Sequence, residues 1–252
     1  LLAAATLSMP ARAVRTVPVQ VDTQLLAGSS YLERGVTYVP LRYLLDAFGD
    51  WDLEWDSQTQ EAVAVSGSTR LTANPSQNTV TVDGTDYSGR VTVENGRTYV
   101  PLRLVAEALG GTAEWDAYLG GAAVTSADAD YNAMDLYWLS RIISAESGGE
   151  SLTGQIAVGN VVLNRVASEE FPDTIPGVIF DQSYSVQFEP VENGTVYRTP
   201  TARSVEAAMR VLDGDEVIGA ALYFYAPALS QGVWINANRT YYQTIGCHRF
   251  YL

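Results

Sequence analysis

A glutamate at the end of an apolar helical stripe is the residue of this chain best placed to do chemistry. Residues 142–150 read IISAESGGE, and Glu146 continues a stripe of apolar residues, spaced three or four apart, that includes Leu139 and Ile143. Ser147 and the two glycines after it predict the end of the helix. A carboxyl group at that end meets the negative pole of the helix dipole and loses solvation, and both effects favour its protonated form. Glu146 is therefore a candidate general acid for a leaving glycosidic oxygen; the alternative is an ordinary solvated carboxylate.

Single copies of cysteine and histidine exclude several other mechanisms. With one cysteine, Cys247, the chain cannot form an internal disulfide, and with one histidine, His248, it cannot build a zinc site from several histidines. Neighbouring residues in an extended segment point to opposite sides, which disfavours a Cys–His hydrolase pair. We therefore expect no metal and no cofactor, a packed or hydrogen-bonded His248, and a small buried apolar Cys247.

Size and charge restrict the fold and the partners. The 252 residues are 47% hydrophobic, which is typical of one large or two ordinary globular domains. A net charge of −14 disfavours binding to nucleic acid or to anionic membranes. Residues 1–13, LLAAATLSMPARA, resemble the remnant of a secretory signal with an Ala-x-Ala cleavage site, and no other run is long enough to span a bilayer. The sequence thus predicts an exported protein.

The front half contains an internal duplication. Residues 35–42, GVTYVPLR, recur as GRTYVPLR at 96–103, and a Glu-Trp-Asp triplet follows in both copies. Thr-Tyr-Val predicts a strand, the proline suits the first turn of a helix, and a glycine closes it. An Asp-Gly pair at 83–84 predicts a hairpin turn. Each repeat is thus expected to be a few strands plus one short helix.

These residues resemble the copper amine oxidase N-terminal-like domain, a stalk-like repeat of exported bacterial proteins. The resemblance covers residues 17–126, as two repeats of about 17–66 and 67–126, and implies a spacer or anchoring module with a wall or protein partner. It does not imply copper chemistry, because this half has no histidine or cysteine. Arg42 and Arg103 are expected to support the helix starts or pair with acids, with ligand contact as the alternative.

Helical patterns dominate the back half. A second helix is expected from about Thr153 to Val166, and a third with Thr199 as N-cap and Pro200 in its first turn. The buried stripe of that third helix is predicted to be Val205, Ala208, Met209 and Leu212. Residues 171–198 are expected to form cleft-lining loops or a small sheet, and the aromatic-rich end suits either a sugar-binding cleft or a core.

The segments 144–150 and 154–166, together with 245–251 (IGCHRFY), resemble the SleB-type cell wall hydrolases, the spore cortex-lytic enzyme family. The resemblance spans about residues 131–252. It implies an α+β chain in which a lysozyme-like domain, mainly helical with a small sheet, follows the β-rich stalk. It also implies cleavage of peptidoglycan glycan strands in spore cortex or cell wall, commonly as a lytic transglycosylase, with Glu146 as catalytic acid.

The resemblance also assigns further site residues. Substrate contacts are predicted at Gln187, Phe188, Tyr223, Tyr225, Trp234 and His248, each with a packing role as the alternative. A transglycosylase needs one carboxyl group, whereas a hydrolase needs a second one nearby. Glu189 and Glu150 are possible second acids; Glu189 stands where the family usually has serine, and both have solvent-exposed or structural roles as alternatives. Asn164 and Arg165 are expected to satisfy buried backbone or an acid.

The leading hypothesis is therefore an exported lytic transglycosylase acting on peptidoglycan glycan strands. The alternative is a non-catalytic peptidoglycan-binding protein whose cleft only grips the glycan. A peptide-stem amidase is remote, given the histidine and cysteine counts.

Overall fold

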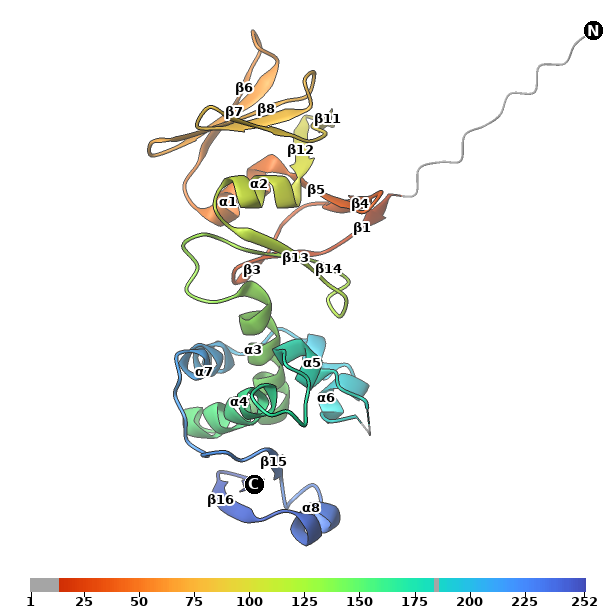
Figure 1. Ribbon diagram of the computed structural model, residues 1–252, viewed down its shortest axis with the longest axis vertical. Coiled ribbons are helices and arrows are strands. Elements are labelled where there is room, and N and C mark those ends of the chain that lie inside the picture. The colour runs from red at the N-terminus through yellow and green to blue at the C-terminus, as the bar shows by residue number, and fades with distance from the viewer. Residues whose placement is uncertain (1–13, 184–185) are drawn as a thin grey trace, which may run out of the picture. The chain divides into compact units, whose positions relative to one another are not determined.

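The computed structural model describes residues 14–183 and 186–252, and the chain folds into two compact units. The first unit ends at Asp128 and the second runs from Ala129 to Leu252. The predicted signal remnant at residues 1–13 lies outside the described residues. Figure 1 labels most of the helices and strands of both units.

The duplicated sequence forms the same strand–helix element twice in the first unit. β5 (Val36–Pro40) leads into α1 (Leu41–Phe48), and β12 (Arg97–Pro101) leads into α2 (Leu102–Ala108). The expected order is confirmed with one correction: Pro40 and Pro101 are the extended N-cap residues that precede each helix, not residues of its first turn. The predicted turn at Asp83-Gly84 is confirmed, because both residues have positive φ and Thr85 pairs with Val82 across it.

Strands from both repeats contribute to every sheet of this unit. One sheet has the order β1 (Arg15–Thr16), β4 (Tyr31–Glu33), β5, β12, β11 (Thr92–Glu94). A second has the order β10 (Thr85–Ser88), β9 (Thr79–Val82), β8 (Thr69–Asn74), β7 (Glu61–Ser66), β6 (Asp52–Asp56). A third has the order β13 (Thr112–Asp116), β14 (Gly121–Thr125), β2 (Val19–Val21), β3 (Gln24–Leu25).

The repeats are interleaved rather than consecutive modules. β5 and β12 pair antiparallel with Val39 opposite Val100, so the two copies of one motif meet at the centre of a sheet. β14 of the second repeat pairs in parallel with β2 of the first. The predicted division near residue 66 falls in the hairpin between β7 and β8, inside a sheet. Each repeat therefore depends on the other for its strand partners.

The apolar faces of α1 and α2 pack with the sheets in one hydrophobic core. Leu41, Leu44 and Leu45 of α1 are buried there, together with Leu102 and Val105 of α2. Because both repeats supply residues to the same core, the burial of apolar surface stabilises the unit as a whole.

Three helices form the body of the second unit. α3 (Ala133–Ser147), α4 (Leu152–Val166) and α7 (Ala202–Leu212) pack against one another in Figure 1. The two predicted helices around Glu146 are confirmed. The prediction for α7 needs correction: its N-cap is Thr201 rather than Thr199, and its buried face is formed by Ser204, Ala207, Ala208 and Val211. The backbone N–H of Thr201 donates to Ser144 Oγ of α3 over 3.2 Å, which ties the start of α7 to α3.

Short helices and a small sheet complete this unit. Residues 171–198 contain α5 (Ile175–Ile179), α6 (Glu189–Glu192) and a 3₁₀ turn at Thr195–Tyr197. The loop prediction holds for the other described residues of this segment, and none of the described residues there forms a sheet. The sheet lies later in the chain, with the order β15 (Tyr223–Tyr225), β17 (His248–Tyr251), β16 (Tyr241–Ile245). The exposed helix α8 (Val233–Asn238) connects β15 to β16. The predicted mixture, a β-rich first part and a mainly helical second part with a small sheet, is confirmed.

Among the described residues, no helix is both long enough and apolar enough to span a bilayer.

We expect Leu44→Ala to lower the free energy of unfolding of the first unit by about 2–5 kcal/mol, because Leu44 is 0% exposed in the shared core. Urea denaturation measures the loss. Leu25→Ala is the matched control, since Leu25 is 54% exposed, and its unfolding curve should overlay that of the unaltered chain. Equal effects of the two changes would contradict a core shared by both repeats.

Candidate active site

The C-terminal end of α3 holds Glu146 in a fixed position. The predicted apolar stripe is confirmed, because Leu136, Leu139, Ile142 and Ile143 are all buried, and Glu146 itself is half-buried. Ser147 Oγ donates to the Ile143 carbonyl oxygen over 2.8 Å and ties down the last turn. The carboxyl group therefore sits where the stripe ends, near the negative pole of the helix.

A buried polar pair fixes the loop that follows. Gln155 Nε2 donates to the carbonyl oxygens of Gly148 (3.4 Å) and Glu150 (3.1 Å), and Ser204 Oγ donates to Gln155 Oε1 over 2.8 Å. Gln155 and Ser204 are both fully buried. The loop after Glu146 is thus held by α4 and α7, which limits movement of the acid.

The pKa of Glu146 is raised from about 4.5 to about 7, chiefly by burial and in smaller part by the negative charge of Glu189. The positive charge of Arg165 opposes the rise. The expectation of a carboxyl group protonated near neutral pH is confirmed. An acid with this pKa can both give up and take back a proton at physiological pH.

Glu146 opens into a cavity of about 400 Å³ between α3, α6 and the segment that precedes α7. Its lining is mixed, and its polar side chains include Arg141, Ser144, Glu146, Glu189, Asn193, Thr195 and Arg198. Glu189 begins α6 and is exposed, so a second carboxylate does face the same cavity as Glu146. Glu189 is thus the predicted second acid that lies near the site.

Glu150, the other possible second acid, is not among the residues that line this cavity. Its carboxylate accepts a hydrogen bond from the Cys247 backbone N–H over 3.2 Å, and hydrogen bonding to Cys247 lowers the pKa of Glu150. A Cβ at Gly246, where φ is +57°, would collide with Glu150 Oε2. Glu150 therefore fastens the β16–β17 turn. Cys247 is exposed in that turn, contrary to the expectation of a buried residue.

Arg165 places a buried positive charge near Glu146. Its Nε donates to the Leu222 carbonyl oxygen over 2.8 Å, and an Nη donates to Gln187 Oε1 over 3.4 Å. Its guanidinium also lies 4.9 Å from the ring centre of Phe171 and 5.2 Å from that of Phe188. Desolvation lowers the pKa of Arg165 to about 10, so it stays charged at neutral pH. The expectation that Arg165 satisfies buried backbone is confirmed, and Gln187 is held beside it.

Aromatic rings and a second arginine continue from Arg165 along the surface of the small sheet. The Arg165 guanidinium is 5.6 Å from the Tyr223 ring, and the Arg239 guanidinium lies 4.3 Å from the same ring and 5.3 Å from that of Trp234. An Nη of Arg239 donates to the Tyr223 hydroxyl over 2.6 Å. Trp234 is 58% exposed. Tyr223 and Trp234 therefore form an anchored, accessible aromatic surface.

Three other predicted substrate contacts have packing partners. Phe188 is buried at the start of α6, and His248 is buried with its ring edge-on to Phe224, 5.3 Å between centres. Burial lowers the pKa of His248. The Tyr225 ring stacks on Tyr251, and its hydroxyl exchanges hydrogen bonds with Asn236. The burial of Phe188 and His248 is what their packing alternative describes, and their contact with substrate stays a prediction.

Sequence reasoning missed the cavity residues Arg141, Asn193, Thr195 and Arg198. Arg141 lies five positions before Glu146, which is off the helical stripe that drew attention to the acid. The others belong to loops and a 3₁₀ turn, where no period indicates which side chains meet.

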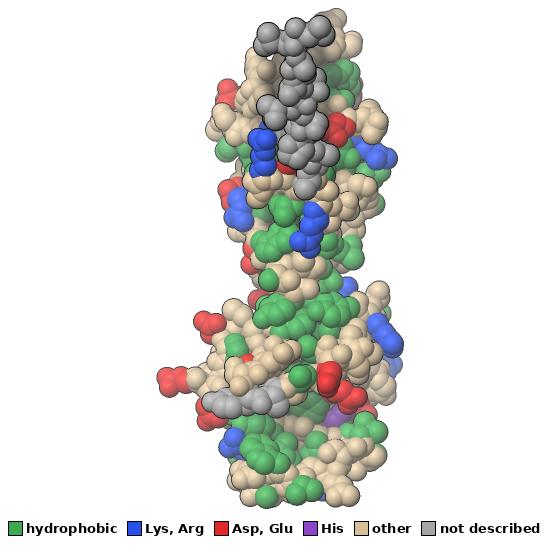
Figure 2. All heavy atoms as spheres, turned by 90° about the vertical axis from the view of Figure 1, so that its right-hand side faces the viewer, with side chains coloured by type: hydrophobic (Ala, Val, Ile, Leu, Met, Phe, Trp, Pro, Cys, Tyr) green, Lys and Arg blue, Asp and Glu red, His purple; other side chains and the backbone are tan. Residues whose placement is uncertain are grey.

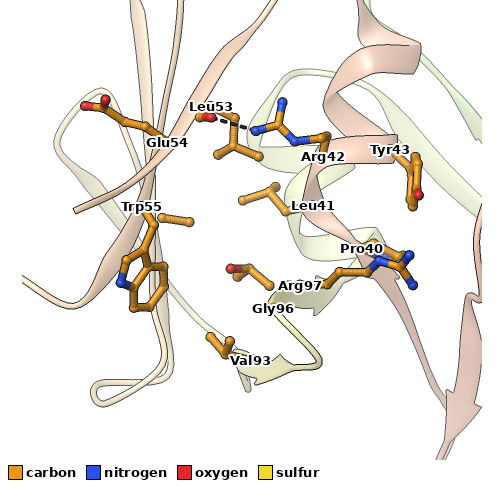
Figure 3. Close-up of a pocket in the computed structure, with 12 residues that line it drawn as sticks. Pro40, Leu41, Arg42, Tyr43, Leu53, Glu54, Trp55, Val93, Gly96 and Arg97 are labelled. Carbon is orange, nitrogen blue, oxygen red and sulfur yellow. Dashed lines mark hydrogen bonds between the residues drawn. The ribbon is translucent and has the colours of Figure 1, made fainter. Parts of the chain in front are cut away.

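The first unit has a groove of its own, of about 360 Å³, beside α1. Figure 3 shows Trp55, Leu41 and Val93 around it, while Glu54 points away and Arg42 donates to the Leu53 carbonyl oxygen over 2.7 Å. Arg42 thus supports the backbone, and Arg103 pairs with Glu107 at 3.5 Å. An exposed acid that points away from its groove lacks the burial that distinguishes Glu146. In the described ranges, no three His, Cys, Asp or Glu side chains gather in a way that could hold a metal ion.

Two family models match this chain. Residues 149–251 match the Cell Wall Hydrolase family, and residues 20–125 match the Copper amine oxidase N-terminal domain. The first match begins three residues after Glu146.

Curated relatives and a solved structure each resemble about half of the chain. A spore cortex-lytic enzyme of Bacillus cereus is 36% identical over 120 residues, which are 48% of this chain and 45% of that protein. One of Halalkalibacterium halodurans is 34% identical over 126 residues, 50% of this chain and 37% of that protein. The chain thus spans less than half the length of these relatives. The catalytic domain of the germination-specific lytic transglycosylase SleB from Bacillus anthracis is 35% identical with a TM-score of 0.44, covering 49% of this chain and 98% of that domain.

Glu146→Gln should remove a pH dependence of stability. The unfolded chain releases this proton near pH 4.5 and the folded chain near pH 7, so the free energy of unfolding falls as pH rises through that window. The difference of 2.5 pH units corresponds to at most about 3 kcal/mol, so above pH 7 the variant should be more stable than the unaltered chain by up to that amount.

Chemical denaturation of the second unit between pH 4.5 and 8.5 measures this difference. Glu206→Gln, which changes an exposed acid on α7, should leave the pH dependence unchanged. Parallel stability curves for Glu146→Gln and the unaltered chain would contradict a raised pKa.

Proposed function

Because this chain carries a cell wall hydrolase domain behind a copper amine oxidase N-terminal-like domain, we propose that it cleaves the glycan strands of peptidoglycan as a lytic transglycosylase. One observation supports this most directly: a single half-buried carboxyl group with a pKa of about 7 opens into a cavity. The relative from Bacillus anthracis is itself described as a germination-specific lytic transglycosylase. We further propose that the chain is exported and acts in the cell wall or the spore cortex.

The first step needs a protonated acid. Glu146 donates its proton to the oxygen that leaves C1 of the muramic residue, and the glycosidic C1–O bond breaks. The developing positive charge on the sugar is then close to the newly ionised carboxylate, which stabilises it electrostatically. The pKa near 7 makes Glu146 a sufficiently strong acid for this transfer while a large share of the molecules remains protonated.

The second step uses the same group as a base. The Glu146 carboxylate takes the proton of the sugar's own 6-hydroxyl as that oxygen attacks C1, so a 1,6-anhydro bond forms and no water is consumed. The enzyme ends the cycle protonated, as it began. One carboxyl group therefore suffices, and Glu189 need not act as nucleophile or activate water.

Arg165 favours the ionised form of Glu146. Its buried charge stabilises the ionised carboxylate, against the effects of burial and of Glu189. Hydrogen bonds to Leu222 and Gln187 hold the guanidinium in place, so its effect on Glu146 is fixed rather than dependent on a mobile side chain. We assign Arg165 as a positioning residue that sets the balance between acid and base forms.

The anchored aromatic surface supports binding of a polysaccharide. Sugar rings pack their C–H faces on exposed aromatic rings. Of the two rings in this surface, Tyr223 and Trp234, the indole of Trp234 is the more accessible. Because Arg239 holds Tyr223 by a hydrogen bond, this surface is already ordered before substrate binds. We propose that it carries sugar residues away from the scissile bond.

Glu146→Gln should abolish release of muropeptide fragments from purified sacculi, because the amide cannot donate the proton. Loss of at least about a thousandfold in rate is expected for removal of the only acid–base group. In the unaltered enzyme, kcat/KM should fall about tenfold per pH unit above pH 7 as the free acid ionises.

Mass spectrometry of the released fragments, with Glu206→Gln as the control for charge, checks the result. Products of the unaltered enzyme should carry 1,6-anhydro ends. Binding to sacculi without any release would instead favour a glycan-binding protein.

Glu189→Gln should move the pH limb without changing the product. Removing the negative charge that raises the pKa of Glu146 shifts the fall in kcat/KM towards lower pH. The proportion of anhydro ends should stay the same, because Glu189 is exposed and the mechanism does not use it. A change from reducing to anhydro ends in this variant would reveal Glu189 as a hydrolytic second acid.

A further inference from the structure

We propose that Arg141 and Arg198 form a carboxylate-binding subsite beside Glu146, which takes the acidic substituent of the muramic residue next to the scissile bond. This inference rests on the proposed function, because the ligand is a group carried by the same glycan. Arg141 comes from α3, one turn and a half before Glu146, and Arg198 follows the Thr195–Tyr197 turn. Both arginines line the cavity into which Glu146 opens.

Positive charge is scarce in this unit. Residues 129–252 contain 14 acidic side chains and only seven arginines, and Figure 2 shows acidic side chains scattered over the face in view. Among the described residues of this unit, one of the seven arginines, Arg210, forms a salt bridge, with Asp215 at 2.5 Å. Arg141 and Arg198 form none, although the acidic Glu189 lines the same cavity as they do. Two unpaired cations in one cavity point to an anionic ligand.

Arg141 is pre-positioned and incompletely hydrogen-bonded. Its guanidinium lies 3.5 Å from the centre of the Tyr137 ring and donates to the Tyr137 carbonyl oxygen over 3.4 Å. Its Nε is buried and has no hydrogen-bond partner. A guanidinium has five N–H donors, and a buried donor without an acceptor is costly, so a carboxylate that completes the set is strongly favoured. Burial lowers the pKa of Arg141, which agrees with a charge that lacks a counter-ion.

The chemistry of the glycan identifies the anion. The hexose rings themselves are neutral, so the negative charge comes from the lactyl ether of muramic acid or from the peptide attached to it. A bare muramic residue presents the lactyl carboxylate, and a substituted one presents carboxylates of the stem peptide. Both offer the same group, which a planar guanidinium binds through paired hydrogen bonds. The subsite would thus orient the muramic residue relative to Glu146.

Soluble glycan strands in three forms test this subsite. One form keeps its stem peptides, a second has lost them to an amidase and exposes the lactyl carboxylate, and in a third the carboxylates are converted to neutral amides. Arg141→Gln, Arg198→Gln and the double variant are compared with Arg203→Gln, which removes an exposed arginine on α7. KM for cleavage is measured, together with Kd in the Glu146→Gln background, where binding is separated from cleavage.

We expect the double variant to raise Kd and KM about tenfold or more for strands that carry the bound carboxylate, and to change them less than twofold for amide strands. Whichever of the first two forms loses affinity identifies the lactyl or the peptide carboxylate. The same loss on amide strands, or no loss on any form, overturns the subsite. Two variants separate loss of binding from a folding defect. Arg198→Gln changes an exposed position, and Arg141→Lys keeps the positive charge. If even the unaltered chain releases no fragments, the proposed function fails, whereas the Kd comparison still decides the subsite.

Discussion

The burial of one carboxyl group at the end of α3 is the constraint on which the site depends. Glu146 must lie deep enough to keep a proton near pH 7, yet reach a cavity large enough for a sugar residue. The structure meets both demands by ending α3 at Ser147 and tying the next loop to the buried side chain of Gln155. Arg165 supplies the opposing positive charge that limits the rise in the pKa of this carboxyl group. A short segment of helix, one loop and one arginine thus set the chemistry, and the rest of the unit holds them in register.

Local signals in the sequence located the acid and the helices that carry it, because periodicity and caps act over a few residues. The same signals misplaced the start of α7. Thr199 and Thr201 are equally good N-caps in isolation, and the hydrogen bond from the Thr201 backbone to Ser144 of α3, more than fifty residues away, accompanies the later start. The buried face of α7 also differs from the predicted one, because Ala207 and Val211 are buried where Val205 and Met209 were expected. Tertiary packing, which a local pattern does not contain, decided both points.

The surroundings of Glu146 were less accessible to prediction. Arg165 looked like a residue that satisfies backbone, which it does, but its contacts with Phe171, Phe188 and Tyr223 come from three separate segments. His248 and Phe188 belong to segments that match the family motifs, yet both are buried. An aromatic or imidazole ring can pack in a core as well as line a binding surface, so the motif alone does not distinguish the two roles. Glu150 shows the same limit: four residues from Glu146 in sequence, it is bonded to the turn at Cys247. A sequence motif therefore identifies important residues, and the three-dimensional structure is needed to tell residues that face the cavity from residues that support the fold.

The interleaved sheets of the first unit also determine the order in which this part of the chain can fold. In the second sheet, which contains β6 to β10, each strand pairs with its immediate neighbours in sequence. This sheet can therefore form as soon as residue 88 has been synthesised. β2 and β14, by contrast, join residues about a hundred positions apart, as Val19 opposite Ala122 illustrates. β2 must therefore remain without one of its partners while most of the unit is being synthesised. A chain that emerges gradually from a ribosome or a translocation pore would complete this unit only when its last hairpin arrives.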